Sequence, residues 1–150
     1  MLKNRRYPEP KPWYPKNKHK YKGDPYKIIS RSSWETKVFN WMDSDPSVLE
    51  WHSEELFIYY LSPVDNKIHN YIPDFLIETK DKTGNIETMI IEIKPKKQSL
   101  IESKTANAKD RMVVAINHAK WQAAMAYCKA QGYTFRVITE DDLFYNGSRK

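Results

Sequence analysis

The chain has 150 residues, of which 40% are hydrophobic, and a formal net charge of +6. This length suits one domain that buries roughly two thirds of its unfolded surface. The single cysteine, Cys128, excludes a framework of internal disulfides and fits a reducing compartment. No hydrophobic run approaches the length that crosses a bilayer. We therefore expect a soluble, intracellular protein without a membrane partner.

The basic excess is concentrated at the N-terminus. Residues 1–27 carry nine Lys or Arg and two acidic residues, so the rest of the chain is close to neutral. Five prolines among tyrosines and tryptophan disfavour helix and predict an extended, partly disordered arm ahead of a domain spanning 28–150. Such an arm suits contact with phosphates and stacking on bases. The equal alternative is a solubilising tail, or one that docks on the protein's own body.

The first predicted element after the arm is a helix. It begins near Ser32 or Ser33 and ends before the Asp45-Pro46 pair. Apolar residues recur within it at helical spacing, and Glu35 lies at the end of the apolar stripe. This position gives Glu35 two alternative roles, one in a functional site and one in a capping box with Ser32.

Three strands are predicted next, at 56–62, at 67–80 and at 86–94, with the turn-rich "DKTGN" between the last two. The last two strands should form a β-hairpin. A polar, basic connection (95–111) leads to a helix from about Met112 to Gln131, which Gly132 ends, and a strand follows at 133–139. This order predicts an α/β fold with a mixed central sheet flanked by helices.

The segment "IIEIKPKK" (90–97) places charges inside an apolar strand. If the hairpin turn is centred near Thr83, Asp74 lies opposite Glu92, with Cβ atoms about 4.5–5.5 Å apart. Two carboxylates so placed repel each other unless a cation lies between them. Lys94 on the same face offers partial relief, but a divalent cation satisfies two carboxylates better, and hard oxygen ligands suit Mg²⁺ or Mn²⁺. The pattern indicates metal-assisted hydrolysis of phosphodiesters.

These residues resemble a known family. Pro73-Asp74 followed by Glu92-Ile93-Lys94 is similar to the PD-(D/E)xK nuclease motif, whose members share a restriction-endonuclease-like mixed sheet with flanking helices. The segments "YKGDPYKIISRSSWE" and "KWQAAMAYCKAQGYTFRVITEDDL" also resemble the head completion nucleases of T4-like tailed phages. A more distant likeness is to the endonuclease subunit of Tn7-type transposition.

The resemblance implies roles for individual residues. Glu35, Asp74 and Glu92 match the family's metal-binding acids, Lys94 its catalytic lysine, and the carbonyl of Ile93 a further ligand. The implied cofactor is Mg²⁺, with Mn²⁺ as a substitute, and the implied substrate is double-stranded DNA. The phage members imply action in the host cytoplasm during head completion and head–tail joining, with capsid portal or neck proteins as partners and the virion as a further location.

Three basic residues beside the motif are expected to contact DNA: Arg31, Lys96 and Lys97. For each, the alternative is an ordinary solvated charge. Asp74 and Glu92 have the corresponding alternative of charges on an exposed sheet face. The alternative functions are a non-cleaving DNA-binding protein of the phage head or neck, and a transposition-type or junction-resolving endonuclease of the same superfamily.

Overall fold

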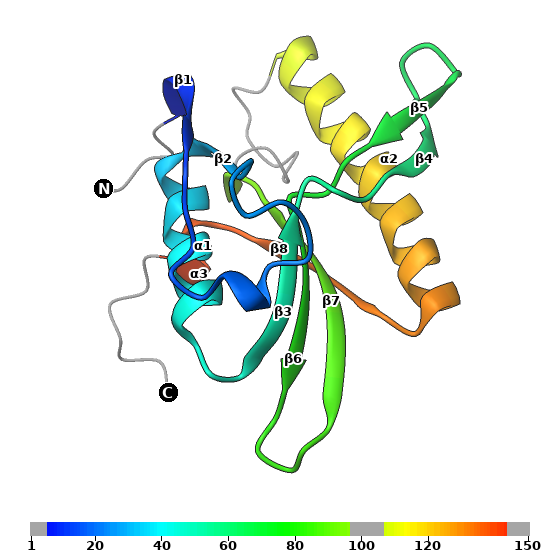
Figure 1. Ribbon diagram of the computed structural model, residues 1–150. Helices are drawn as coiled ribbons and strands as arrows, with labels where there is room; N and C mark the ends of the chain where they lie inside the picture. Colours follow the sequence, from blue (N-terminus) through cyan, green and yellow to red (C-terminus); the bar gives the residue numbers. More distant parts are fainter. Residues whose placement is uncertain (1–5, 97–106, 144–150) are drawn as a thin grey trace.

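The structure, a computed structural model, describes residues 6–96 and 107–143 (Figure 1). Its centre is a four-stranded sheet in the order β3-β6-β7-β8. β3 pairs with β6 and β6 with β7 in antiparallel fashion, whereas β8 runs parallel to β7. The sheet elements and the two long helices are β3 (Val48–Ser53), β6 (Phe75–Lys80), β7 (Ile86–Ile93), β8 (Thr134–Ile138), α1 (Ser33–Ser44) and α2 (Ala108–Gln131).

One helix lies on each face of this sheet (Figure 1). On the α1 face, Trp34, Phe39 and Met42 of the helix pack against Trp51 and Phe75 of the strands. On the α2 face, Trp121, Ala124 and Cys128 pack in a cluster with Ile90 of β7. The predicted mixed sheet with flanking helices is therefore confirmed, and each face of the sheet contributes to a core of its own.

Both helices have the caps that their sequences favour. Ser32 is the N-cap of α1, and its hydroxyl accepts a hydrogen bond from the Glu35 amide at 3.2 Å. α2 begins four residues before the predicted Met112, because Asn107 and Asp110 form a capping box there. Gly132 ends α2 in the left-handed conformation, at φ 78°.

The strand prediction for 67–80 is wrong in one respect. The chain breaks at Ile72-Pro73-Asp74 into β5 (Ile68–Tyr71) and β6, because proline has no amide to donate to a sheet. β5 pairs with β4 (Ile58–Leu61), so the predicted 56–62 strand belongs to a separate two-stranded sheet beside α2. Its expected place in the main sheet is taken by β3, which the sequence patterns did not indicate.

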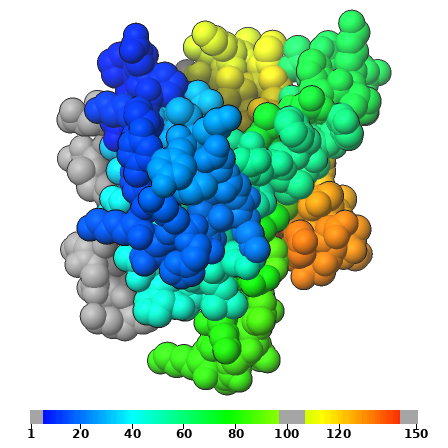
Figure 2. Space-filling model, viewed as in Figure 1, coloured from blue at the N-terminus to red at the C-terminus, as the bar shows by residue number. Residues whose placement is uncertain are grey.

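The N-terminal arm packs on the body in its described part. β1 (Arg6–Pro12) pairs with β2 (Ile29–Ser32), and a 3₁₀ turn, η1 (Lys18–Lys20), follows. Tyr21 belongs to the core on the α1 face, and Trp13 packs against it. Figure 2 shows the arm lying along the front of the molecule. Residues 6–27 therefore follow the alternative in which the arm docks on the protein's own body. The boundary between arm and domain at residue 27 stays a prediction.

The described chain ends in a short helix, α3 (Glu140–Leu143), formed by the acidic segment after β8. Across the described residues, no helix is both long and apolar enough to cross a membrane.

Candidate active site

A cavity of about 390 Å³ opens where β6 begins and β7 ends. Polar groups from both sides of the sheet converge on it. The lining residues are Arg6, Ser32, Glu35, Asp74, Glu92, Ile93, Lys94 and Pro95. The three predicted acids and the predicted lysine therefore share one cavity, although up to 59 positions separate them in the sequence.

The hairpin register that brings Asp74 to Glu92 is confirmed. Phe75 pairs with Ile91 and Lys80 with Ile86, which places Asp74 opposite Glu92 at the open end of the ladder. The Asp74 amide donates to Oε1 of Glu92 at 3.3 Å. The Ile93 amide in turn donates to Oδ2 of Asp74 at 2.8 Å. Each carboxylate is thus held by the backbone of the other strand.

Burial of this pair disfavours its charges. Burial raises the pKa of Asp74 well above its ordinary value, and the nearby Glu92 charge raises it further. Burial also raises the pKa of Glu92, an effect that Lys94 opposes. Two adjacent acids with raised pKa values are typical of a site that holds a cation or moves protons. Keeping both carboxylates charged costs free energy, and a bound cation or proton offsets it.

Lys94 and Tyr71 contact the two oxygens of Glu92 from different sides. Nζ of Lys94 lies 3.7 Å from Oε2, and the Tyr71 hydroxyl donates to Oε1 at 2.9 Å. Tyr71 is buried, with 3% of its surface exposed. The glutamate is therefore oriented by a buried tyrosine that sequence reasoning missed, while the lysine amine remains at the cavity.

Glu35 combines a structural role with a place at the site. Its Oε1 accepts a hydrogen bond from the Arg31 amide at 3.0 Å, whereas a capping box would use the amide of the N-cap, Ser32. Only the Ser32 half of that box is formed. Burial raises the pKa of Glu35, and Arg6 and Arg31 oppose this effect. A buried acid that lines the cavity with Asp74 remains available to a cation there.

Arg31 lies beside the site and is paired with Glu54. Its Nε and Nη2 donate to Oε2 and Oε1 of Glu54, at 2.9 and 3.2 Å. Glu54 has a positive φ of 56° and donates its amide to the Asp74 carbonyl at 3.2 Å. A left-handed conformation is unfavourable for a residue with a Cβ by roughly 1–2 kcal/mol. The Glu54 loop therefore supports Asp74, and contact of Arg31 with DNA stays a prediction.

Of the two lysines that follow the motif, the structure describes only Lys96. Nζ of Lys96 lies 3.1 Å from Oδ2 of Asp141, and its amide donates to Oε1 of Glu140 at 2.7 Å. These contacts hold the chain after β7 against α3. Contact of Lys96 with DNA stays a prediction, and Lys97 lies outside the described residues.

A second lysine near the acids was not predicted. Nζ of Lys120, on α2, lies 5.8 Å from the ring centroids of both Tyr60 and Tyr71. Burial and the neighbouring Lys94 lower its pKa, while Glu92 and Asp74 act in the opposite direction. Lys120 lies 26 residues after Lys94 on another element, so the sequence around it does not indicate a place near the acids. Only the packing of α2 on the sheet brings it close to them.

The oxygen donors at the cavity are of the type that a hard divalent cation prefers, but within residues 6–96 and 107–143 no three acidic, histidine or cysteine side chains converge closely enough to form a metal site by themselves. Carboxylate oxygens of Glu35, Asp74 and Glu92 face one cavity, and carboxylates are preferred ligands of Mg²⁺ and Mn²⁺. Ile93 donates its amide toward Asp74, and a strand residue directs its carbonyl to the same neighbouring strand as its amide. Typical zinc sites use cysteine sulfur or histidine nitrogen as ligands, and the residues lining this cavity include neither.

An acid pair joined across a hairpin, a lysine two residues after the second acid, and a helix glutamate define the class of PD-(D/E)xK nucleases. Comparison with known sequences agrees. Residues 45–140 match the family described as TnsA-like endonuclease N terminal. The chain is also 39% identical over 140 residues to the head completion nuclease of Enterobacteria phage T4, covering 87% of this chain and 91% of that protein. The chain therefore belongs to the TnsA-like endonuclease family, a nuclease family.

Proposed function

We propose that this protein is a Mg²⁺-dependent deoxyribonuclease that hydrolyses phosphodiester bonds of double-stranded DNA, and that Mn²⁺ can substitute. The observation that carries the proposal is the placement of the Asp74 and Glu92 carboxylates side by side, each accepting a hydrogen bond from an amide of the opposite chain segment, with Lys94 3.7 Å from Glu92. A purely structural role does not require a buried and a half-buried acid, both with raised pKa values, side by side.

Each residue has a distinct role in this proposal. Glu35, Asp74 and Glu92, with the Ile93 carbonyl, would hold the cation. When bound, Mg²⁺ supplies Lewis-acid stabilisation of the charge that develops on the phosphate. Lys94 orients the attacking water and offsets negative charge on the phosphoryl oxygens. Tyr71 fixes the Glu92 carboxylate, since its hydroxyl donates to Oε1.

We further propose that the cleavage serves phage head completion and head–tail joining after DNA packaging. The support is the similarity to a T4 protein named head completion nuclease, which extends over nearly the whole of both chains. In this role the protein acts in the host cytoplasm, and its partners are DNA and the portal or neck proteins of the capsid.

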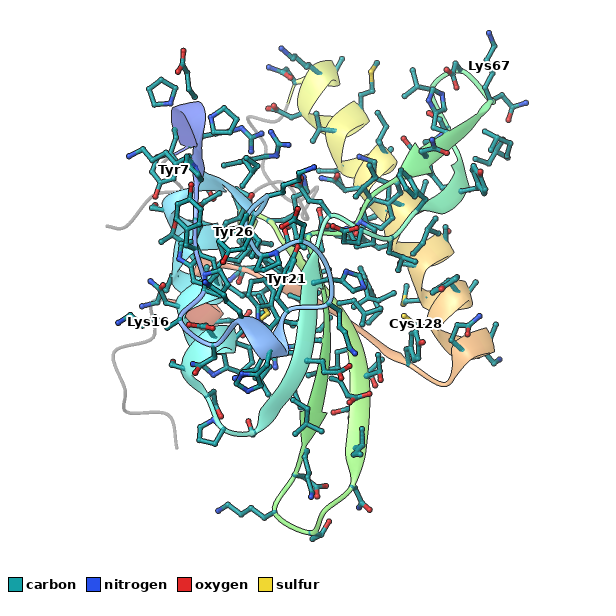
Figure 3. The ribbon with its side chains drawn as sticks, in the orientation of Figure 1. Tyr7, Lys16, Tyr21, Tyr26, Lys67 and Cys128 are labelled. Atoms are coloured by element: carbon teal, nitrogen blue, oxygen red, sulfur yellow. The ribbon has the colours of Figure 1, made fainter. Side chains whose placement is uncertain are left out.

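The test is cleavage of plasmid and linear duplex DNA by purified protein. We expect cleavage with Mg²⁺ or Mn²⁺, none with EDTA, and losses of about 100-fold or more for Asp74→Ala and Lys94→Ala. Lys67→Ala, at the tip of the β4–β5 hairpin, is the control (Figure 3). Wild-type protein that binds DNA and leaves it intact with either metal would favour the non-cleaving head or neck protein. Cleavage that survives in both site variants would place the active site elsewhere.

The family match favours one second candidate, an endonuclease of the transposition type. Both candidates use the same residues and differ in the DNA that they recognise. Rates on linear, nicked and four-way junction substrates of equal length separate them, because a junction-resolving or transposition-type enzyme should prefer a branched or specific site. Equal rates on all three substrates support the head completion role.

A further inference from the structure

The N-terminal arm brings one of its basic residues to the candidate active site. Arg6 is the first residue of β1 and pairs with Ser32 of β2, the N-cap of the helix that carries Glu35. Arg6 lines the same cavity as Glu35, Asp74 and Glu92. An arm expected to be extended and partly disordered therefore contributes a cation to the cavity.

This position is supported by contacts of the residues that follow Arg6 in the arm. Its neighbour Tyr7 is hydrogen-bonded through its hydroxyl to Oγ1 of Thr36 at 3.1 Å, one residue after Glu35. Figure 3 shows Tyr7 beside α1. Further along the arm, the Trp13 amide donates to the Ile28 carbonyl at 3.0 Å. The arm is thus held to the body by the side chain of Tyr7 and, just after β1, by the backbone of Trp13.

The guanidinium of Arg6 differs from the other basic groups near the acids. Arg31 is engaged by both oxygens of Glu54, and Lys94 lies against Glu92. The ion pairs between described residues do not include Arg6. Its side chain is exposed, and its charge acts on Glu35 from across the cavity. An arginine in this position presents a planar fork that matches a phosphate oxygen pair.

We propose that Arg6 binds the phosphate of the strand being cut, through its guanidinium and the non-bridging oxygens, so that the arm completes the active site. This inference rests on the proposed nuclease function. The cavity acids would hold the cation, and Arg6 would contact the phosphate from the β1 side of the same cavity. Tyr7 is a positioning residue, because it ties the strand beside Arg6 to α1.

The experiment compares wild type with Arg6→Ala, Arg6→Lys, Tyr7→Phe and Lys16→Ala. Lys16 is the matched control, because it is an exposed cation on the same arm that Figure 3 places near the other end of α1 from Tyr7. We expect Arg6→Ala to lower kcat about 100-fold with Mg²⁺. Arg6→Lys should retain more activity, Tyr7→Phe should lose a few-fold, and Lys16→Ala should resemble wild type. Added guanidinium ion should partly restore Arg6→Ala and leave Lys16→Ala unchanged.

Binding of a labelled duplex in EDTA, at several salt concentrations, gives a readout that needs no cleavage. Loss of one phosphate contact should reduce the slope of log Kd against log salt by about 0.9 in Arg6→Ala. A reduced slope with an inert wild type would support the Arg6 contact and reject the nuclease function. An active wild type with unchanged kcat and slope in Arg6→Ala would overturn the Arg6 proposal alone. Melting temperatures confirm that each variant is folded.

Discussion

The Asp74 amide donates to the Glu92 carboxylate at 3.3 Å, so the backbone of one acid neutralises part of the charge of the other. This contact aligns the two side chains on neighbouring strands without screening them from each other. The isosteric changes Asp74→Asn and Glu92→Gln each keep one oxygen that can accept the backbone hydrogen bond and remove a negative charge that burial disfavours. We expect each to raise the free energy of unfolding of metal-free protein at pH 7 by roughly 1–3 kcal/mol. The melting temperature should rise by several degrees, while cleavage is lost.

The same variants should lose the response to metal. Mg²⁺ or Mn²⁺ should raise the melting temperature of wild type by mass action and leave both variants nearly unchanged. Calorimetry or fluorescence melting checks this. A variant that is less stable than wild type without metal would contradict the view that the two carboxylate charges destabilise the metal-free protein.

The stability of metal-free protein should depend on pH through these acids. A carboxyl whose folded pKa is raised binds more protons when folded, so its contribution falls as pH rises from the unfolded value, about 4, toward the folded value. The pKa of Asp74 is raised well above that value. The melting temperature of Asp74→Asn minus that of wild type should therefore be near zero at low pH and grow as pH rises. A melting-temperature difference that stays constant between these two pH values would contradict the raised pKa of Asp74.

Asp81 provides a control of opposite sign. Its pKa is lowered by the hydrogen bond from the Thr83 hydroxyl and by backbone amides in the hairpin turn. A lowered folded pKa contributes stability that is present above the unfolded pKa and lost as pH falls through the folded value. Asp81→Asn should therefore destabilise the protein at neutral pH, and the difference from wild type should shrink in acid.

Tyr71→Phe isolates the buried hydrogen bond to Glu92. We expect a loss of about 1–3 kcal/mol of unfolding free energy, since the hydroxyl donates to a charged group. The pKa of Glu92 should rise further, because this hydrogen bond lowers it. Cleavage should then require higher pH or more metal. Tyr59→Phe is the control, because Tyr59 is 70% exposed. Equal pH profiles for the two variants would exclude a role for the Tyr71 hydroxyl.

Lys120→Met tests the unpredicted lysine on α2. Its charge lowers the pKa of Glu92, and its amine lies over the rings of Tyr60 and Tyr71. Removing the charge should raise the pKa of Glu92 and shift the acidic limb of the cleavage profile to higher pH. The methionine should retain most of the packing. Lys129→Met, exposed on the same helix, is the control. Overlapping profiles for the two variants would assign Lys120 a packing role only.

Much of the fold and the acid pair were predictable because local signals determine them. The turn at 81–85 sets the register of β6 and β7, since Oδ1 of Asp81 accepts hydrogen bonds from the Thr83 and Asn85 amides. A register fixed by a turn places Asp74 opposite Glu92. The helix of Glu35 is similarly determined by the Ser32 cap. These features involve residues close in sequence or paired through one short loop.

The remaining features depend on packing between distant segments. Pro73 separates β5 from β6 within the segment predicted as one strand, which moves Tyr71 to the α2 side of the sheet. Lys120 reaches the acids only because α2 crosses that face. Arg6 is placed by the pairing of β1 with β2, which a proline-rich, basic composition does not indicate.

The position of Arg6 at the cavity has a practical consequence for biochemical work. β1 begins at Arg6, beside Glu35 and Asp74. A histidine affinity tag added to the N-terminus would carry imidazoles that bind divalent cations themselves. Such a tag would compete for Mn²⁺ and distort a metal titration. Removing it before activity measurements therefore belongs to the design of every experiment on this site.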